Sequence, residues 1–258
     1  FCFGQSHKPS QHRVILISHR LLESGYNPPR SHSNLKGFST TMSTKTTLIL
    51  SAVLILVTIL VGGLLWSQLP DPMASHWNEA DQVDGYMPRV WGTFMIPLMM
   101  TGLTVLFLLI PLIDPLKRNV AEFRGWFNLF ILFFNLFMLY IHSLTLLWNL
   151  GWTGFRMSSA MIPAMGLLFI FIGLMLNKAK RNYFIGIRTP WTLANDVVWQ
   201  KTHRLGSKLF ILAGILTLLA LFFPDQAIWI FMIAILGATL TVLVYSYIAF
   251  KQEEKKTI

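Results

Sequence analysis

The sequence predicts an all-α, polytopic membrane protein: a bundle of six transmembrane helices with both termini in the cytoplasm. Of the 258 residues, 54% are hydrophobic and only 12% are charged, against roughly 25% charged in soluble domains. Six apolar stretches are long enough to cross the roughly 30 Å hydrocarbon core of a bilayer. The formal charge of +10 lies in short segments between these stretches, which is typical of membrane topology signals. Direct nucleic-acid binding is therefore not expected, and the lipid bilayer is the first predicted partner.

The chain divides at Met42. Residues 1–41 are rich in Ser, His, Pro and Asn, and we expect a disordered or non-native extension there, with a genuine cytoplasmic tail as the alternative. Residues 42–258 are expected to form the six-span membrane domain. Its spans are predicted at residues 47–66, 91–113, 126–148, 159–176, 208–223 and 227–250, of which the fifth is short. The first span exceeds a signal-peptide core and lacks a small-residue cleavage site, so a cleaved signal peptide is not favoured.

Lys and Arg residues on alternate connections predict the orientation. One side holds Lys45, the basic residues of segments 117–124 and 178–208, and the basic residues of segment 251–256, whereas the other side holds only Arg89 and Arg156. Because cytoplasmic connections carry the excess of Lys and Arg, this distribution places both termini in the cytoplasm. Two termini on one side require an even number of spans, which supports six.

A short sequence echo links the second and fourth spans. Residues 95–99 read Met-Ile-Pro-Leu-Met, and residues 161–165 read Met-Ile-Pro-Ala-Met. A duplicated helical hairpin would explain the echo, and chance similarity between apolar segments explains it equally well.

The outer loop, residues 69–90, holds four side chains that could in principle bind a divalent cation: His76, Glu79, Asp81 and Asp84. Their spacing matches no established metal motif, so we predict no metal site. A structured, turn-rich loop with Asp84 and Gly85 in a turn is favoured. This loop is the largest predicted exoplasmic surface, where a ligand from outside would arrive first.

The third span carries a polar stripe that repeats every seven residues: Asn128, Asn135, His142 and Asn149. Seven residues are nearly two helical turns, so the four side chains share one face. Polar groups in hydrocarbon need partners, and the stripe is therefore expected to face the bundle interior. Hydrogen bonding between helices is the favoured explanation. A polar pathway with His142 as a proton-sensitive element is the alternative.

The connection at residues 177–207 interleaves aromatic and basic side chains. Thr189 and Pro190 can begin a short helix as its cap and first residue, or Thr192 can cap a slightly later one. From Asp196 onward, helical spacing separates an apolar face from a polar one, which predicts a segment lying in the membrane interface before the fifth span. A solvated, positively charged orientation loop is the simpler alternative.

No catalytic, cofactor or metal site is predicted. The single Cys2 excludes a disulfide framework, and no zinc-type Cys and His spacing is present. The spans contain no Ser/His/Asp set and no His-Glu-x-x-His motif. Asp114 and Glu122 are expected to be solvated residues of a cytoplasmic turn.

Several motifs resemble the SdpI family of bacterial immunity membrane proteins. The most specific is Asn-Tyr-Phe-Ile-Gly-Ile-Arg-Thr-Pro-Trp-Thr-Leu at residues 182–193, followed by Val-Trp at 198–199 and Lys-Thr-His-Arg at 201–204. Leu-Pro-Asp-Pro at 69–72, His-Trp at 76–77, Asp-Gly at 84–85, Pro-Leu-Ile-Asp-Pro at 111–115 and Asn119 are also similar. The resemblance extends from Met42 to the C-terminus.

This resemblance implies a protein that protects a cell from a secreted Sdp-type peptide toxin. It also implies, as a further possibility, a signal transducer that holds a small winged-helix repressor at the membrane. The residues implied in toxin sensing belong to the outer loop: Pro72, His76, Trp77 and Asp84. The residues implied in cytoplasmic partner binding are Tyr183, Gly186, Arg188, Thr189, Pro190, Trp191, Trp199, Lys201, His203 and Arg204. A small transporter using the polar stripe of the third span is the alternative function.

Overall fold

The computed structural model describes residues 42–256, so the predicted extension at 1–41 lies outside the described residues. Six helices in the described range are long and apolar enough to cross a membrane. They are α2 (Thr44–Leu65), α3 (Arg89–Ile113), α5 (Arg124–Asn149), α6 (Met157–Leu176), α8 (Asp196–Leu219) and α9 (Ala227–Glu254). The predicted six-helix membrane fold is confirmed, and the chain is a multi-pass protein of the cell membrane.

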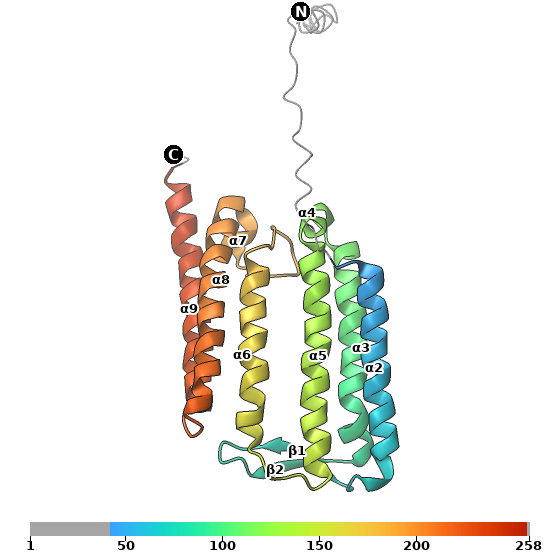
Figure 1. Cartoon of the computed structure of the whole chain (residues 1–258). Helices are drawn as coiled ribbons and strands as arrows, with labels where there is room; N and C mark the ends of the chain where they lie inside the picture. The colour runs from blue at the N-terminus through green and yellow to red at the C-terminus, as the bar shows by residue number, and fades with distance from the viewer. Residues whose placement is uncertain (1–41, 257–258) are drawn as a thin grey trace, which may run out of the picture. The chain divides into compact units, whose positions relative to one another are not determined.

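The six helices lie side by side and alternate in direction, so the start of α2 and the end of α9 share one end of the bundle (Figure 1). We call this end the terminal end. The short helices α4 (Lys117–Glu122) and α7 (Pro190–Ala194) also lie there. The opposite end, the hairpin end, carries the strands β1 (Met73–Trp77) and β2 (Val83–Met87). The 3₁₀ turns η1 (Trp66–Gln68) and η2 (Ala220–Phe222) extend α2 and α8 toward that end.

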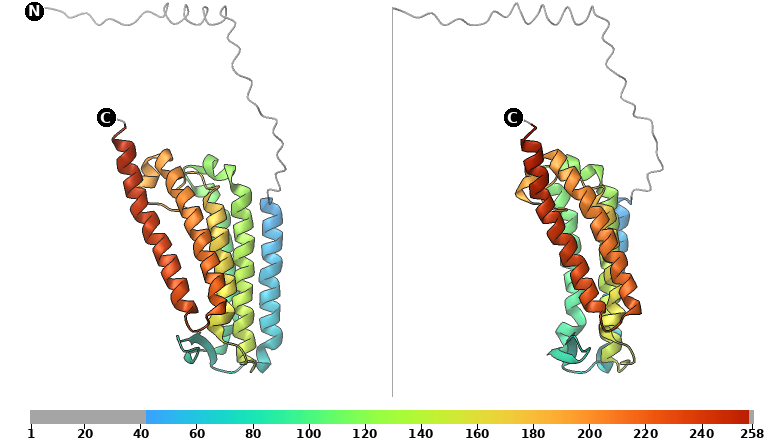
Figure 2. Two further views of the ribbon diagram at one scale, coloured as in Figure 1. Left: turned by 60° about the vertical axis from the view of Figure 1, so that its left-hand side comes forward. Right: turned by 90° about the vertical axis from the view of Figure 1, so that its left-hand side faces the viewer.

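The helices form two groups in chain order. Helices α2, α3 and α5 pack on one another, and α6, α8 and α9 form the second group (Figure 2). Glycines bring α6 and α8 close together, since a Cβ atom on Gly173 would lie 2.8 Å from the carbonyl oxygen of Ser207. Such small-residue contacts are a standard way to pack helices in lipid, where apolar burial gives little driving force. Aromatic side chains join the groups, and Phe133 stacks on Phe171 with 4.9 Å between ring centroids.

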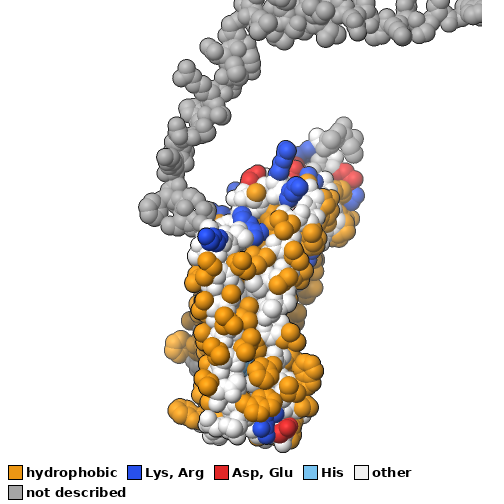
Figure 3. Space-filling view, turned by 90° about the vertical axis from the view of Figure 1, so that its right-hand side faces the viewer, with side chains coloured by type: hydrophobic (Ala, Val, Ile, Leu, Met, Phe, Trp, Pro, Cys, Tyr) orange, Lys and Arg blue, Asp and Glu red, His pale blue; other side chains and the backbone are white. Residues whose placement is uncertain are grey.

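The bundle surface has the pattern expected of a protein surrounded by lipid. Apolar side chains cover the helix flanks in Figure 3, and Lys and Arg gather mainly at the terminal end. Leu64 and Leu112, for example, are 78% and 71% exposed. Soluble monomers rarely expose apolar patches of this extent. The cytoplasmic position of the terminal end stays a prediction, which rests on this distribution of Lys and Arg.

One helix prediction is wrong. The segment beginning at Asp196 is not separate from a short fifth span, because α8 continues without a break from Asp196 to Leu219. Asn195 caps this helix by accepting hydrogen bonds from the Val197 and Val198 amides. Thr202 and Gly206 face inward along the same helix, and both are buried. The buried face of the first turns thus continues directly into the spanning part.

Candidate functional site

The outer loop folds into a β-hairpin, which the sequence did not predict. Strands β1 and β2 pair in antiparallel fashion with His76 opposite Gly85. A Cβ atom on Gly85 would lie only 2.8 Å from the Cβ of His76, so the absent side chain permits this close pairing. The predicted turn at Asp84 and Gly85 is wrong, because both residues lie within β2. The chain reverses at residues 78–82, where the Asn78 side chain accepts hydrogen bonds from two backbone amides.

Residues of α3 and α5 anchor the hairpin to the bundle. Asn149, at the end of α5, accepts a hydrogen bond from the Ala74 amide at 2.8 Å and donates one to the Ala74 carbonyl at 3.0 Å. Its amide therefore pairs with β1 as a neighbouring strand would. Met73 is fully buried against Gly92, where a Cβ atom would lie 2.7 Å from the Met73 sulfur. The start of β1 is thereby held against the ends of two helices.

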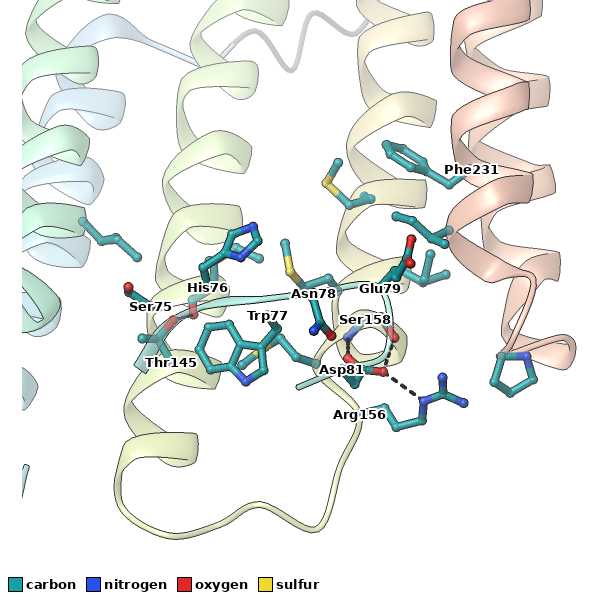
Figure 4. Close-up of a pocket in the computed structure, with 18 of the residues that line it drawn as sticks. Ser75, His76, Trp77, Asn78, Glu79, Asp81, Thr145, Arg156, Ser158 and Phe231 are labelled. Atoms are coloured by element: carbon teal, nitrogen blue, oxygen red, sulfur yellow. Dashed lines mark hydrogen bonds and ion pairs between the residues drawn. The ribbon is translucent and has the colours of Figure 1, made fainter. Parts of the chain in front are cut away.

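An ion-pair network fastens the tip of the hairpin to the second helix group. Asp81 accepts hydrogen bonds from the Ser158 amide at 2.8 Å, the Ser158 hydroxyl at 2.6 Å and the Arg156 Nε at 2.9 Å (Figure 4). Arg156 also donates to Asp225, in the connection between α8 and α9, at 2.8 Å. The residue before α6, Arg156, does not cap the helix with its side chain. Asp81, from a distant part of the sequence, therefore accepts the hydrogen bond of a free backbone amide in the first turn of α6.

Two features of the environment of Asp81 shift its pKa in opposite directions. Burial favours the neutral acid and raises its pKa, but the hydrogen bonds from Ser158 and the Arg156 guanidinium outweigh burial, and the net pKa is lowered. The two carboxylates raise the pKa of Arg156 in turn. The network therefore remains ionised at neutral pH.

A cavity of about 600 Å³ lies between the hairpin and the ends of α3, α5, α6 and α9 at this end of the bundle. Its volume lies within the range of roughly 300–1,000 Å³ that is typical of small-molecule sites. Both copies of the Met-Ile-Pro motif contribute to its wall, through residues 95–96 and 161–162. His76 and Glu79 point from the hairpin toward the helices in Figure 4. The cavity thus combines an apolar helical wall with a polar hairpin wall.

The structure places two of the four predicted outer-loop residues in the lining of this cavity. His76 and Trp77 line it, and Asp84 pairs with His76 at 2.5 Å. Pro72 is exposed and lies outside the lining. Within residues 42–256, no three His, Cys, Asp or Glu side chains converge as metal ligands. The four candidate ligands instead separate into the His76–Asp84 pair, the Asp81 network and Glu79.

The polar stripe of α5 faces the interior of the first helix group. Asn128, Asn135 and His142 are at most 1% exposed. Asn128 donates to the Met42 carbonyl at 2.8 Å, and Asn135 donates to the Thr104 hydroxyl at 3.0 Å. Together with Asn149 and its bonds to β1, the asparagines thus join α5 to neighbouring segments along its length. These contacts favour packing as the role of the stripe.

His142 differs from the asparagines. Among the described residues, neither of its ring nitrogens has a hydrogen-bond partner. Its Nε2 atom lies close to α2, because a Cβ atom on Gly62 would be 3.8 Å away. The imidazole therefore packs beside a glycine of α2, and its two nitrogens make no hydrogen bond to the described residues.

The signature loop, residues 177–207, is built around buried polar contacts. Trp199 donates from its indole nitrogen to the Ala179 carbonyl at 2.9 Å, and its ring stacks on His203 at 4.0 Å. His203 Nδ1 lies 2.9 Å from the Trp199 carbonyl, and its Nε2 accepts from the Ile187 amide at 3.1 Å. A carbonyl can only accept, so the proton is on Nδ1 and the imidazole is neutral.

Gly186 makes room for this arrangement. Its φ of +105° favours glycine, and a Cβ atom there would fall 2.4 Å from the His203 Nε2 atom. Thr189 caps α7 in a capping box with Thr192, which confirms the first of the two predicted helix starts. Trp199 and His203 are 1% and 2% exposed, so neither can contact a partner directly while this loop is folded.

The remaining signature residues are accessible at the terminal end. Tyr183, Arg188, Pro190 and Arg204 are exposed, and Trp191 and Lys201 are partly exposed. Arg188 donates to the Tyr183 carbonyl at 2.8 Å, and Lys201 pairs with Glu253 at 2.6 Å. The signature thus divides into a buried scaffold and an exposed surface.

The sequence reasoning missed the role of Asp114. This residue is 2% exposed and is not a solvated turn residue. Its carboxylate accepts from the Leu116 amide at 2.6 Å and from the Tyr183 amide at 2.9 Å. Nearby, Asn119 donates to the Arg181 carbonyl at 2.8 Å. The sequence held a sign of this role. Residues 111–115 and Asn119 resemble the SdpI family, as does the signature loop to which they are hydrogen-bonded.

Comparisons with known proteins find matches in the region of the signature loop and in the region of the hairpin. Residues 178–247 match the SdpI/YfhL protein family, and residues 53–101 match a domain of unknown function, DUF1648. The chain is 28% identical over 197 residues to the immunity protein SdpI of Bacillus subtilis (strain 168), an alignment that covers 75% of this chain and 90% of that protein. No solved structure matches. The predicted resemblance to the SdpI family is confirmed.

Proposed function

We propose that this SdpI-like chain is an immunity protein that protects its cell from a secreted Sdp-type peptide toxin. The observation that carries the proposal is the similarity to an immunity protein over nine tenths of that protein's length. The two family matches include the hairpin, within residues 53–101, and most of the signature loop, within residues 178–247.

The hairpin end is the part that would meet the toxin. The basic residues at the terminal end favour a cytoplasmic position for it, which leaves the hairpin and its cavity on the outer side. The cavity has a volume of about 600 Å³, and His76 and Trp77 contribute to its lining. A pocket of mainly apolar lining with a few polar groups is the usual form of a ligand site. We therefore assign toxin engagement to this cavity.

The test is survival of toxin-sensitive cells that express the chain. Wild type should protect, and Met161→Trp should reduce protection because the indole would occupy the cavity. Met99→Trp is the matched control, since Met99 belongs to the other Met-Ile-Pro copy but is 45% exposed and lies outside the lining. Membrane levels of the three proteins should be equal by immunoblot. Wild-type cells that die as readily as cells with an empty vector would refute the immunity function.

A second, finer part of the proposal concerns signalling. The exposed signature residues, including Arg188 and Arg204, would bind a small winged-helix repressor and hold it at the membrane. Arg204 is the better probe, because Arg188 also supports the loop through its bond to the Tyr183 carbonyl. The exposed side chain of Arg204 makes no hydrogen bond or ion pair with the described residues.

This part is tested with a fluorescent repressor fusion, taken from a winged-helix reading frame next to the gene for this chain. Toxin should move the fusion to the membrane in cells with the wild-type chain, and Arg204→Glu should leave it in the cytoplasm. Arg118→Glu, a charge reversal at the same end but outside the signature, should behave as wild type. Recruitment that persists with Arg204→Glu would contradict the assignment of this surface.

A further inference from the structure

The hairpin-end cavity has two chemically different walls. The helical wall is formed largely by thioether and hydrocarbon side chains, including Met95, Met161, Met165, Ile162 and Phe231. Methionine is unbranched and polarizable, and surfaces rich in it adapt to apolar partners of varied shape. This wall is suited to apolar side chains without requiring one fixed outline.

The polar wall, formed by the hairpin and the adjoining helix connections, carries an excess of negative charge. Glu79, Asp81 and Asp225 line the cavity, and Arg156 is the only Lys or Arg among the lining residues described. Two of these carboxylates are already engaged, because Arg156 pairs with Asp81 and with Asp225. Glu79 makes no hydrogen bond or ion pair with the described residues, and its side chain points toward the helices in Figure 4.

An unpaired carboxylate beside an apolar wall is well suited to a cationic ligand. Burying an ion without a partner is costly, whereas a charge-assisted hydrogen bond to a cation is among the stronger polar contacts in proteins. The neighbouring His76 does not supply that cation to Glu79, since its Nδ1 faces Asp84. A ligand that covers Glu79 therefore gains most if it brings its own positive charge.

We propose that the cavity binds an apolar peptide segment that carries one lysine or arginine side chain, with the cation at Glu79 and the apolar side chains against the methionine wall. This inference deepens the proposed function, on which it rests, by naming the chemistry of the ligand. A volume of about 600 Å³ accommodates a few side chains rather than a folded domain. The acidic excess selects against a segment that is apolar but negatively charged.

The test uses the full chain in phosphatidylcholine nanodiscs and two labelled synthetic nonapeptides of Leu and Phe. One has a central Lys and the other a central Glu, and binding is measured by fluorescence anisotropy with empty nanodiscs as background. The wild-type chain should bind the Lys peptide about tenfold more tightly, the size expected for one charge-assisted contact. Glu79→Lys should reverse the preference, and Met161→Trp should weaken both peptides.

Glu122→Lys is the matched control, because Glu122 lies at the terminal end and pairs there with Lys180 at 3.6 Å. It should keep the wild-type preference. Equal affinity for the two peptides, binding no greater than to empty nanodiscs, or an unchanged preference in Glu79→Lys would overturn the proposal. Binding that ignores charge but is lost in Met161→Trp would show that the cavity accepts any apolar segment, and would also overturn the proposal.

The peptide assay contains no toxin, so its outcome is separable from that of the survival assay. If wild-type cells survive toxin while the peptides show no charge preference, immunity stands and the ligand chemistry is wrong. If the preference is present while cells die, the cavity chemistry stands and the immunity function is wrong.

Discussion

Replacing Asp81 should loosen the hairpin and destabilise the protein measurably. The Asp81 side chain is 9% exposed and acts as the cap of α6 through the Ser158 amide. Loss of such a cap costs about 1 kcal/mol, and loss of the 2.6 Å bond from the Ser158 hydroxyl to a charged oxygen costs about 1.5 kcal/mol. The exposed pair with Arg156 adds little. Asp81→Ala should therefore lower the free energy of unfolding by about 2–3 kcal/mol.

The effect should depend on pH in a defined direction. The pKa of Asp81 is lowered in the folded protein, because the hydrogen bonds from Ser158 and Arg156 outweigh the opposing effect of burial. A depressed folded pKa stabilises the protein fully above the pKa of the unfolded carboxyl, about 4, and this contribution fades as the pH falls through the folded value. The stability difference between wild type and Asp81→Asn should thus be constant near neutral pH and shrink below about pH 4.

Thermal unfolding in detergent measures the global effect, and hydrogen exchange of residues 73–87 measures the local one. Glu79→Gln is the control, because this side chain is in the same turn but makes no hydrogen bond or ion pair with the described residues. The control should match wild type in both measurements. An Asp81→Ala protein with wild-type unfolding temperature and wild-type exchange in the hairpin would show that the network does not fasten it.

Two further substitutions test the helix packing and the signature loop. Gly173→Leu should destabilise the bundle by about 1–3 kcal/mol through overpacking against α8, whereas Gly237→Leu, where a Cβ meets nothing within 4 Å, should be neutral in the same thermal assay. His203→Ala should cost about 1–3 kcal/mol and speed hydrogen exchange at the Ile187 amide, which loses its acceptor. Arg204→Ala, at the exposed neighbour, should leave that exchange unchanged, and equal exchange in both variants would contradict the role assigned to His203.

The spans could be predicted because lipid imposes a length and a composition on every crossing segment. The prediction at 227–250 and the observed helix Ala227–Glu254 begin at the same residue. The fifth span was placed too late, because the polar first turns of α8 reduce its hydropathy although they belong to the same helix. Gly206 lies just before the predicted span, and in the structure it is a point of close packing within α8, where a Cβ would meet Ile187.

The site was less predictable because it depends on contacts between distant segments. Asp81 reads as a loop carboxylate, and its role appears only when the hairpin meets Ser158, 77 residues away. Asp114 likewise gains its meaning from the Tyr183 amide, 69 residues away. The Met-Ile-Pro echo was visible in the sequence, but only the fold shows that both copies line one cavity. The spacing of residues along a helix predicts which face is buried, but it does not predict which other segments of the chain contact that face.

The residues of the polar stripe of α5 share a periodic spacing but differ in their hydrogen bonds, and His142 allows a test of this difference. Asn135 is bonded to Thr104, so Asn135→Leu should strand a buried hydroxyl and destabilise the protein by about 1–2 kcal/mol. His142 is equally buried but has no partner among the described residues, so His142→Leu removes two unsatisfied nitrogens and should be neutral or stabilising. Thermal unfolding of both variants in the same detergent decides the matter. If His142→Leu is as costly as Asn135→Leu, the imidazole has a partner such as a bound water, and the polar stripe then does more than join helices.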